Sequence, residues 1–132
     1  MSNPVKEVLK ANLEFYRAFA ASDYQSLVAC WSSSEQISVT HPGSSAIHGR
    51  KAVLKGWQLI LENSGGKGIR CTHTKAYVFQ GFAYVICEEL VNESRLNATN
   101  IFVLEQGSWR MVHHQASVNN EVAGPDPEHS LH

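Results

Sequence analysis

The spacing of apolar residues changes once along this chain, and that change restricts the folds it can adopt. Over the first half, apolar side chains recur three and four positions apart, as on helices with one buried face. From Lys67 onward they alternate with polar residues, as on strands with one covered face. Helices first and strands afterwards predict an α+β fold in which the helices pack on one face of an antiparallel sheet.

Start and stop signals divide this pattern into elements. Asn3 and Pro4 are a capping residue and a first-turn proline, and Ser22-Asp23-Tyr24-Gln25 is a capping box. Gln80-Gly81 and Gln106-Gly107-Ser108 are tight turns that contain glycine. We predict three helices over about 4–21, 22–31 and 50–63, a short strand over about 35–41, and long strands over about 69–79, 82–91, 97–105 and 109–118.

The length of the chain suits one domain. Its 132 residues, 43% of them hydrophobic, can supply a core without cross-links. We expect that domain over residues 1–118. Residues 119–132 are polar and contain Pro125 and Pro127, so we expect a mobile tail there.

Charge and cysteine content argue against several classes of protein. The net charge is −1 and the basic residues are scattered, so no nucleic-acid partner is expected. No apolar run is long enough to span a membrane, and the N-terminus lacks the apolar segment of a signal peptide. The three cysteines have no Cys-x-x-Cys spacing, which favours free thiols over a zinc site. We therefore expect a cytoplasmic protein without a membrane partner.

The register of the last hairpin predicts which residues share a sheet face. A three-residue turn at 106–108 places Asn100 opposite His114 and Phe102 opposite Val112. A turn one residue shorter or longer would exchange His114 for its neighbours in the sequence.

The preceding hairpin extends this face by one strand. A turn around residues 94–95 places Glu89 opposite Asn100 and Cys87 opposite Phe102. Glu89, Asn100 and His114 would then form a polar row on the face that the helices cover. Because buried polar groups must be hydrogen-bonded, the row either satisfies itself as a structural network or lines a cavity.

Several segments, in the right order over about residues 5–118, together resemble the SnoaL-like branch of the nuclear-transport-factor-two-like superfamily. They are Ser22-Asp23-Tyr24-Gln25-Ser26-Leu27, Thr40-His41-Pro42-Gly43, His48-Gly49-Arg50-Lys51-Ala52-Val53, Thr99-Asn100-Ile101-Phe102 and the run from Trp109 to Ser117. The resemblance implies a cone: three helices in the concave face of a strongly curved, cystatin-like sheet, a pocket at the wide end, and usually a homodimer. Relatives include ketosteroid isomerase, polyketide cyclases, dehydratases and the association domain of calcium/calmodulin-dependent kinase.

The resemblance also assigns roles to single positions. His41 stands where ketosteroid isomerase has its aspartate base, whereas Phe15 replaces the tyrosine that binds the oxyanion. Tyr16 is adjacent, but a helix turns it about 100° away. This departure argues against ordinary steroid-isomerase chemistry. Asn100 and Ala116 stand where the kinase association domain has an arginine-lined pocket, so that positive charge is missing here.

These observations favour a pocket for a small apolar or amphipathic molecule. The pocket could support a cofactor-independent lyase or isomerase in which His41, Glu89 and His114 transfer protons, with the Glu89 carboxylate raising the basicity of His114. The alternative is a non-catalytic ligand-binding or oligomerisation module, with His41 bonded to a backbone carbonyl and the row closed on itself. Whether the chain is an enzyme stays open. The residues expected to contact a ligand are Asn100, Phe15, Phe19, Trp31, Trp57 and Phe102.

Two further expectations concern metals and self-association. His41, His114 and Glu89 could together hold a divalent ion, but no element carries a His-x-His or His-x-x-x-His pair, so we expect neither metal nor cofactor. We expect a homodimer through the outer sheet face, because that face is too apolar for a soluble monomer to leave exposed. The residues predicted on it are Tyr84, Ile86, Ile101, Val103, Trp109 and Met111.

Overall fold

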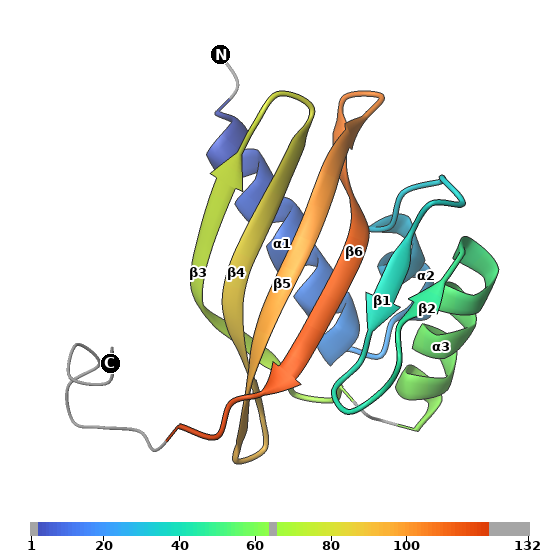
Figure 1. Ribbon diagram of the computed structural model, residues 1–132, viewed down its shortest axis with the longest axis vertical. Coiled ribbons are helices and arrows are strands. Elements are labelled where there is room, and N and C mark those ends of the chain that lie inside the picture. The colour runs from blue at the N-terminus through green and yellow to red at the C-terminus, as the bar shows by residue number, and fades with distance from the viewer. Residues whose placement is uncertain (1–2, 64–65, 122–132) are drawn as a thin grey trace.

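The computed structural model, which describes residues 3–63 and 66–121, has the predicted α+β order of elements, with one short strand before the third helix that was not predicted (Figure 1). Three helices and two short strands come first, and four long strands follow. The helices are α1 (Pro4–Ala20), α2 (Tyr24–Ala29) and α3 (Arg50–Glu62). The strands are β1 (Ser38–Thr40), β2 (Ile47–His48), β3 (Arg70–Val78), β4 (Phe82–Val91), β5 (Ser94–Glu105) and β6 (Ser108–Val118).

All six strands form one sheet in the order β2-β1-β6-β5-β4-β3. Neighbouring strands are antiparallel except β1 and β6, which run parallel. In Figure 1, α1 crosses behind β3 to β6, while α2 and α3 lie beside β1 and β2. The β1–β6 pairing aligns Val39 with His114 and Thr40 with Gln115, so the segment after β1 begins beside the C-terminal part of β6.

The helix starts follow the expected capping chemistry with one shift. The Asn3 side chain accepts from the Lys6 amide, and Pro4 opens α1. At α2 the capping residue is Asp23, whose Oδ1 accepts from the Ser26 amide, and not Ser22. Ser22 instead has a φ of 54° in the turn between the helices.

Helix α2 also ends two residues before the predicted position, because the chain after it joins the sheet. The Met111 amide donates to the Cys30 carbonyl at 2.8 Å, and the Ser32 amide donates to the Met111 carbonyl at 2.9 Å. Trp31 thereby forms a bridge to Met111 and packs beneath β6.

The last hairpin has a shorter turn than predicted. Gln106 and Gly107 alone form it, with φ values of 49° and 82°, so Glu105 pairs with Ser108. Phe102 consequently pairs with Met111, and the predicted Phe102–Val112 pair is wrong.

A bulge then restores the register of the polar row. Between Ile101 and Phe102 the pairing slips by one residue, which leaves Val112 as the extra residue on β6. Beyond the bulge Asn100 pairs with His114, as predicted. The Asn100–His114 pair was predicted correctly because two errors cancelled: the turn was predicted one residue too long, and the bulge of one residue on β6 was not predicted.

The hairpin between β4 and β5 differs from the prediction by a larger amount. Its turn is Asn92-Glu93, so Glu89 pairs with Leu96 and Cys87 with Ala98. The predicted Glu89–Asn100 and Cys87–Phe102 pairs are wrong. The displacement is an even number of residues, however, so Glu89 stays on the inner face with Asn100.

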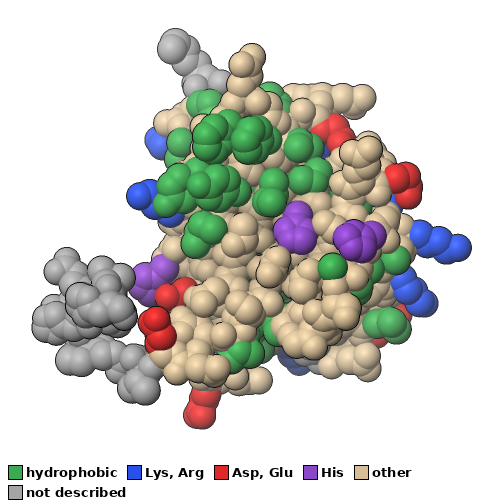
Figure 2. Space-filling view, viewed as in Figure 1, with side chains coloured by type: hydrophobic (Ala, Val, Ile, Leu, Met, Phe, Trp, Pro, Cys, Tyr) green, Lys and Arg blue, Asp and Glu red, His purple; other side chains and the backbone are tan. Residues whose placement is uncertain are grey.

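The bulge also changes which residues lie on the outer face. Met111 is fully buried under the helices, and Trp109 lies in a cleft with residues of α1, so both predictions of outward exposure are wrong. Tyr84, Ile86 and Val103 alternate with buried neighbours and point outward as predicted, as does Ile101. Figure 2 shows apolar side chains gathered over the end of this face that lies at the top of the view.

In the ranges 3–63 and 66–121, no helix has both the length and the apolar character needed to cross a membrane. The mobile tail was predicted over 119–132, and residues 122–132 of it lie outside the described residues.

Candidate functional site

A cavity of about 390 Å³ opens between the end of α1, α3 and the ends of β4 to β6. It brings together His41, Glu89 and His114, the three residues predicted to transfer protons. Phe19 also lines it. The rest of the lining is mostly apolar: Pro42, Ile60, Ile69, Val91, Asn92, Ser94, Leu96 and Ala116.

The other residues expected to contact a ligand lie behind this lining. Phe15, Trp57 and Phe102 are fully buried, and Trp31 is nearly so. Phe15 and Trp57 pack against the His114 ring, with ring centroids 5.4 Å and 5.3 Å away. They shape the cavity by holding the imidazole in place.

His114 is held in one tautomer by Asn100. The His114 Nδ1 lies 2.5 Å from the Asn100 Oδ1, while the Asn100 amide nitrogen donates to Asn12 Oδ1 at 2.8 Å and to Tyr16 Oη at 3.1 Å. Because the amide nitrogen is engaged there, the Asn100 oxygen accepts and His114 Nδ1 carries the proton. The bare Nε2 of neutral His114 therefore faces Glu89, with Glu89 Oε2 3.7 Å away.

Tyr16 connects Glu89 to the rest of the row. Its hydroxyl donates to Glu89 Oε2 at 2.6 Å and accepts from Asn100. The 100° offset from Phe15, which had argued against a role for Tyr16, is what directs it toward β4 and β5. Helix α1 buries both positions because its covered face is wide, as the 4.9 Å contact between the two rings shows.

Sequence reasoning missed Tyr16 and Asn12 as members of this row. Their spacing of four residues places them one turn apart on the apolar face of α1. The sequence pattern that could have identified them is a polar residue on an apolar helix face, followed four positions later by a tyrosine. Both side chains are almost fully buried.

Burial moves the proton affinities of Glu89 and His114 in opposite directions. It raises the pKa of Glu89 to about 7, against the opposing effect of the Tyr16 hydrogen bond. It lowers the pKa of His114 to about 3, with the neighbouring His41 and His113 adding to the effect. At neutral pH His114 is thus uncharged and Glu89 is close to half protonated. The expectation that Glu89 raises the basicity of His114 is wrong, because desolvation dominates.

His41 follows β1 and stands across the cavity from His114, with ring centroids 6.4 Å apart. Its ring packs edge-on against Trp57 at 4.8 Å, and burial lowers its pKa. The Nε2 atom is buried without a hydrogen-bond partner among the described residues, and it lies against α3 near Gly56. In the described part of the chain, His41 thus contributes to the cavity wall a ring with a lowered pKa and an Nε2 atom without a partner.

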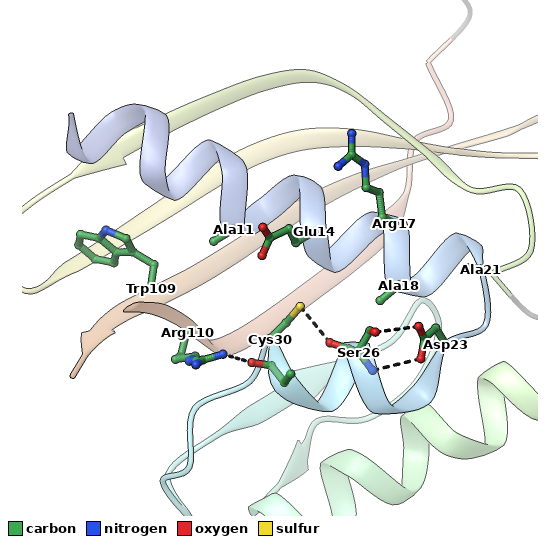
Figure 3. Close-up of a pocket in the computed structure, with 11 residues that line it drawn as sticks. Ala11, Glu14, Arg17, Ala18, Ala21, Asp23, Ser26, Cys30, Trp109 and Arg110 are labelled. Carbon is green, nitrogen blue, oxygen red and sulfur yellow. Dashed lines mark hydrogen bonds between the residues drawn. The ribbon is translucent and has the colours of Figure 1, made fainter. Parts of the chain in front are cut away.

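A second cleft, of about 500 Å³, lies between α1, α2 and β6 (Figure 3). Its polar groups are largely engaged within the protein. Asp23 accepts from Ser26, the Cys30 thiol donates to the Ser26 carbonyl, and the Arg110 guanidinium donates to the Ala29 carbonyl. The cleft contains no member of the polar row.

Within the described part of the chain, no group of three or more His, Cys, Asp or Glu side chains has an arrangement suited to a metal ion. The absence of a metal or cofactor stays a prediction.

Comparisons with known proteins identify the family and the fold of the chain. The family model described as a SnoaL-like domain matches residues 8–121. The chain is 24% identical over 115 residues to the F-box protein SKIP8 of Arabidopsis thaliana, an alignment that covers 86% of this chain and 50% of that protein. The chain thus spans about half the length of this curated relative.

Two solved structures have the same fold. One is a dehydratase candidate of the NTF2-like family from Streptomyces avermitilis, with a TM-score of 0.76, 24% identity, and coverage of 88% of this chain and 96% of that one. The other is a candidate calcium/calmodulin-dependent protein kinase type II association domain from Thiobacillus denitrificans, with a TM-score of 0.71, 27% identity, and coverage of 83% and 93%.

Proposed function

This chain belongs to the family of SnoaL-like domains, and we propose that it binds a small uncharged molecule in the cavity at Glu89 and His114. We propose further that side chains of the cavity remove a proton from the bound molecule or add one to it. The observation that carries the proposal is geometric: His41, Glu89 and His114 line one mostly apolar cavity, and Glu89 Oε2 lies 3.7 Å from His114 Nε2. Burial raises the pKa of the Glu89 carboxyl group to about 7. An acid–base group works best when its pKa is near the working pH.

The three titratable groups suit different parts of one proton transfer. Glu89 can take or give a proton at neutral pH, and Tyr16 steadies its carboxyl group by donating to Oε2. His114 presents a bare Nε2 to the same region, held in that tautomer by Asn100. His41 adds a third ionisable side chain to the same cavity, with its ring centroid 6.4 Å from that of His114. Such a set supports removal of a proton next to a carbonyl group, or loss of a β-hydroxyl group, as in a cofactor-independent isomerase or lyase.

The lining favours an uncharged ligand. The residues of the described cavity wall include no lysine or arginine, so a carboxylate or phosphate would lie unneutralised beside Glu89. The walls are mostly apolar, and a volume of about 390 Å³ is near the lower end of the range for small-molecule sites. A small apolar or amphipathic carbonyl compound fits both features. The dehydratase candidate supports this reading at the level of the fold alone.

The alternative is a non-catalytic module that binds a ligand or associates with itself. The hydrogen bonds among Asn12, Tyr16, Glu89, Asn100 and His114 favour it, because a network that satisfies itself needs no substrate. The 27% identical association domain also supports it.

Exchange of carbon-bound protons separates the two functions. The protein is incubated in heavy water with a set of small neutral ketones, and loss of the proton next to the carbonyl is followed by NMR. We expect faster exchange for at least one ketone with the unaltered protein, and loss of that acceleration in Glu89→Gln. The matched control is His48→Ala, which removes an exposed histidine outside the cavity lining and should keep the exchange.

Ketones that shift the His114 signal without any exchange would favour the binding module. If no ketone shifts the signal or exchanges, and no small molecule accompanies the purified protein in native mass spectrometry, the cavity is not a ligand site.

A further inference from the structure

Two of the three cysteines lie together behind the polar row, at the sheet edge formed by β3. Cys71 on β3 pairs with Glu89, and Cys87 is two residues from Glu89 on the same face. The two thiols are therefore diagonal neighbours on one face of the sheet. All three cysteines are free thiols in this structure.

The surroundings of the two thiols differ. Cys71 is half-buried and lines a surface hollow of about 260 Å³ with Leu9, Asn12, Leu13 and Thr74. The Asn12 amide donates to Cys71 Sγ at 3.7 Å, and Thr74 Oγ1 lies 3.4 Å from it. Cys87 is buried, with its Sγ 3.5 Å from Tyr16 Oη. One thiol is thus open to small reagents and the other is available only to its neighbour.

We propose that Cys71 and Cys87 form an oxidisable pair, in which a small hydroperoxide reacts at Cys71 and Cys87 then closes a disulfide. In the first step the Cys71 sulfur attacks the peroxide oxygen, which gives a sulfenic acid and an alcohol, or water from hydrogen peroxide. In the second step the Cys87 sulfur attacks the Cys71 sulfur, the S–O bond breaks, and the departing hydroxide takes the Cys87 proton as water. The peroxide is reduced by two electrons and the two thiols are oxidised by two.

The protonation states support this order of events. The neighbouring Cys87 thiol lowers the pKa of Cys71 to about 7, with Thr74 and Asn12 contributing, whereas Cys71 and burial raise the pKa of Cys87. Thiolates are the reactive form, so Cys71 reacts first. Cys30, in the cleft between α1 and α2, has its pKa raised to about 11 by burial and is the natural unreactive control.

The strand geometry makes the bond a reversible one. Diagonal neighbours on a sheet are separated by about 7–8 Å between Cα atoms, slightly more than a relaxed disulfide spans. Closing the bridge therefore requires a small movement of the backbone, and the pairing of β3 with β4 is already interrupted between Thr72 and Lys75, next to Cys71. A bridge closed by such movement draws the Cys87 sulfur away from Tyr16, the residue that holds Glu89. Oxidation would therefore alter the polar row, whatever the cavity binds.

The test uses the full chain treated with hydrogen peroxide and analysed by intact mass and by iodoacetamide labelling. We expect the unaltered protein and Cys30→Ser to lose two hydrogen atoms within one chain, and reduction to restore them. Cys87→Ser should stop at a sulfenic acid that dimedone traps on Cys71, and Cys71→Ser should not be oxidised at the same peroxide dose. Before oxidation, Cys71 should be alkylated at least about tenfold faster than Cys30.

A second readout reports the link to the polar row. In the oxidised protein the side-chain amide signal of Asn100, which donates to Tyr16, should shift, and it should not shift in peroxide-treated Cys71→Ser. Equal alkylation rates for all three cysteines, a disulfide that needs Cys30, or disulfides only between chains would each overturn the proposal. These measurements involve no ligand, so they stand or fall separately from the proposed proton transfer.

Discussion

Glu89 and His114 bind protons in opposite order in the folded and unfolded chain. The folded pKa of Glu89, about 7, is above its ordinary 4.5, so folding is favoured while Glu89 is protonated and loses stability as the pH rises from about 4.5 to 7. The folded pKa of His114, about 3, is below its ordinary 6.5, so stability is lost as the pH falls from about 6.5 to 3. Between about pH 4.5 and 6.5 the two slopes cancel. The pair alone therefore gives greatest stability in that window.

Glu89→Gln separates the two contributions, because glutamine keeps the shape of the protonated side chain and cannot ionise. A pKa of about 7 in place of 4.5 corresponds to about 3 kcal/mol. We expect the stability of Glu89→Gln relative to the unaltered protein to rise by roughly that amount between about pH 4 and pH 8. Urea unfolding across this range measures the difference.

The matched comparison is Glu62→Gln, an exposed carboxylate at the end of α3, which should show no such rise. A Glu89→Gln protein that is less stable than the unaltered one at alkaline pH would mean that Glu89 is held as a carboxylate.

Gly66, which precedes β3, lies directly against the ring of Phe19. A Cβ atom there would stand 1.8 Å from Phe19 Cε1 and 1.9 Å from Phe19 Cδ1, so the aromatic ring occupies the space of a side chain. Phe19 is itself packed edge-on against Trp57 at 5.0 Å and lines the cavity. Gly66 therefore leaves the space that the Phe19 ring of α1 occupies.

Gly66→Ala should destabilise the protein by about 1–3 kcal/mol, because the Phe19 ring must leave a well-packed position. Gly56→Ala is the matched control within α3, where the new Cβ would have only ordinary contacts, at 3.6 Å from Ile47 Cδ1 and 3.9 Å from His41 Nε2. Alanine favours helix over glycine, so this control should stabilise by about 0.5–1 kcal/mol. Thermal melts of both variants test whether Gly→Ala lowers the stability at position 66 and raises it at position 56. A Gly66→Ala protein as stable as the unaltered one would contradict the close contact with Phe19.

At the scale of the whole molecule, the outer side of the sheet carries an apolar patch at the end that lies at the top of Figure 2. Stacked aromatic pairs follow the edge, with Tyr77 on Tyr84 and Phe79 on Phe82, each 4.8 Å between centroids. Phe79 is 51% exposed and Ile86 is 41% exposed, values that a soluble monomer rarely combines in one patch. Self-association through this face remains our prediction, and the association-domain relative is consistent with it.

Ile86→Lys should weaken such a dimer strongly. In a two-fold interface each protomer contributes the same residue, so the substitution places two positive charges in the interface. We expect the apparent dissociation constant in analytical ultracentrifugation to increase at least about tenfold. Leu59→Lys, which alters an equally exposed residue on α3, should leave it unchanged. Light scattering that finds only monomers of the unaltered protein at micromolar concentration would exclude this dimer.

The order of elements and the face on which each residue lies could be predicted from the sequence, because both depend on local periodicity. Alternation along a strand places Cys87 and Glu89 on one face. Asn100 of the next strand is assigned to the same face as long as the predicted pairing register is wrong by an even number of residues. Capping signals and glycine turns gave the helix and strand limits to within a few residues. Strand alternation and the family resemblance together predicted that His41, Glu89 and His114 share a pocket. All three line one cavity in the structure.

Only the tertiary structure decided which of these residues touch. The bulge opposite Ile101 placed Met111 inside and Trp109 beside α1, and a bulge has no reliable signal in its own segment. The crossing of α1 over the sheet brought Tyr16 to Glu89 across 73 positions of chain, and burial then set the two opposite pKa shifts. Contact between distant segments and exclusion of water are properties of the packed chain, so neither could be obtained from local sequence patterns.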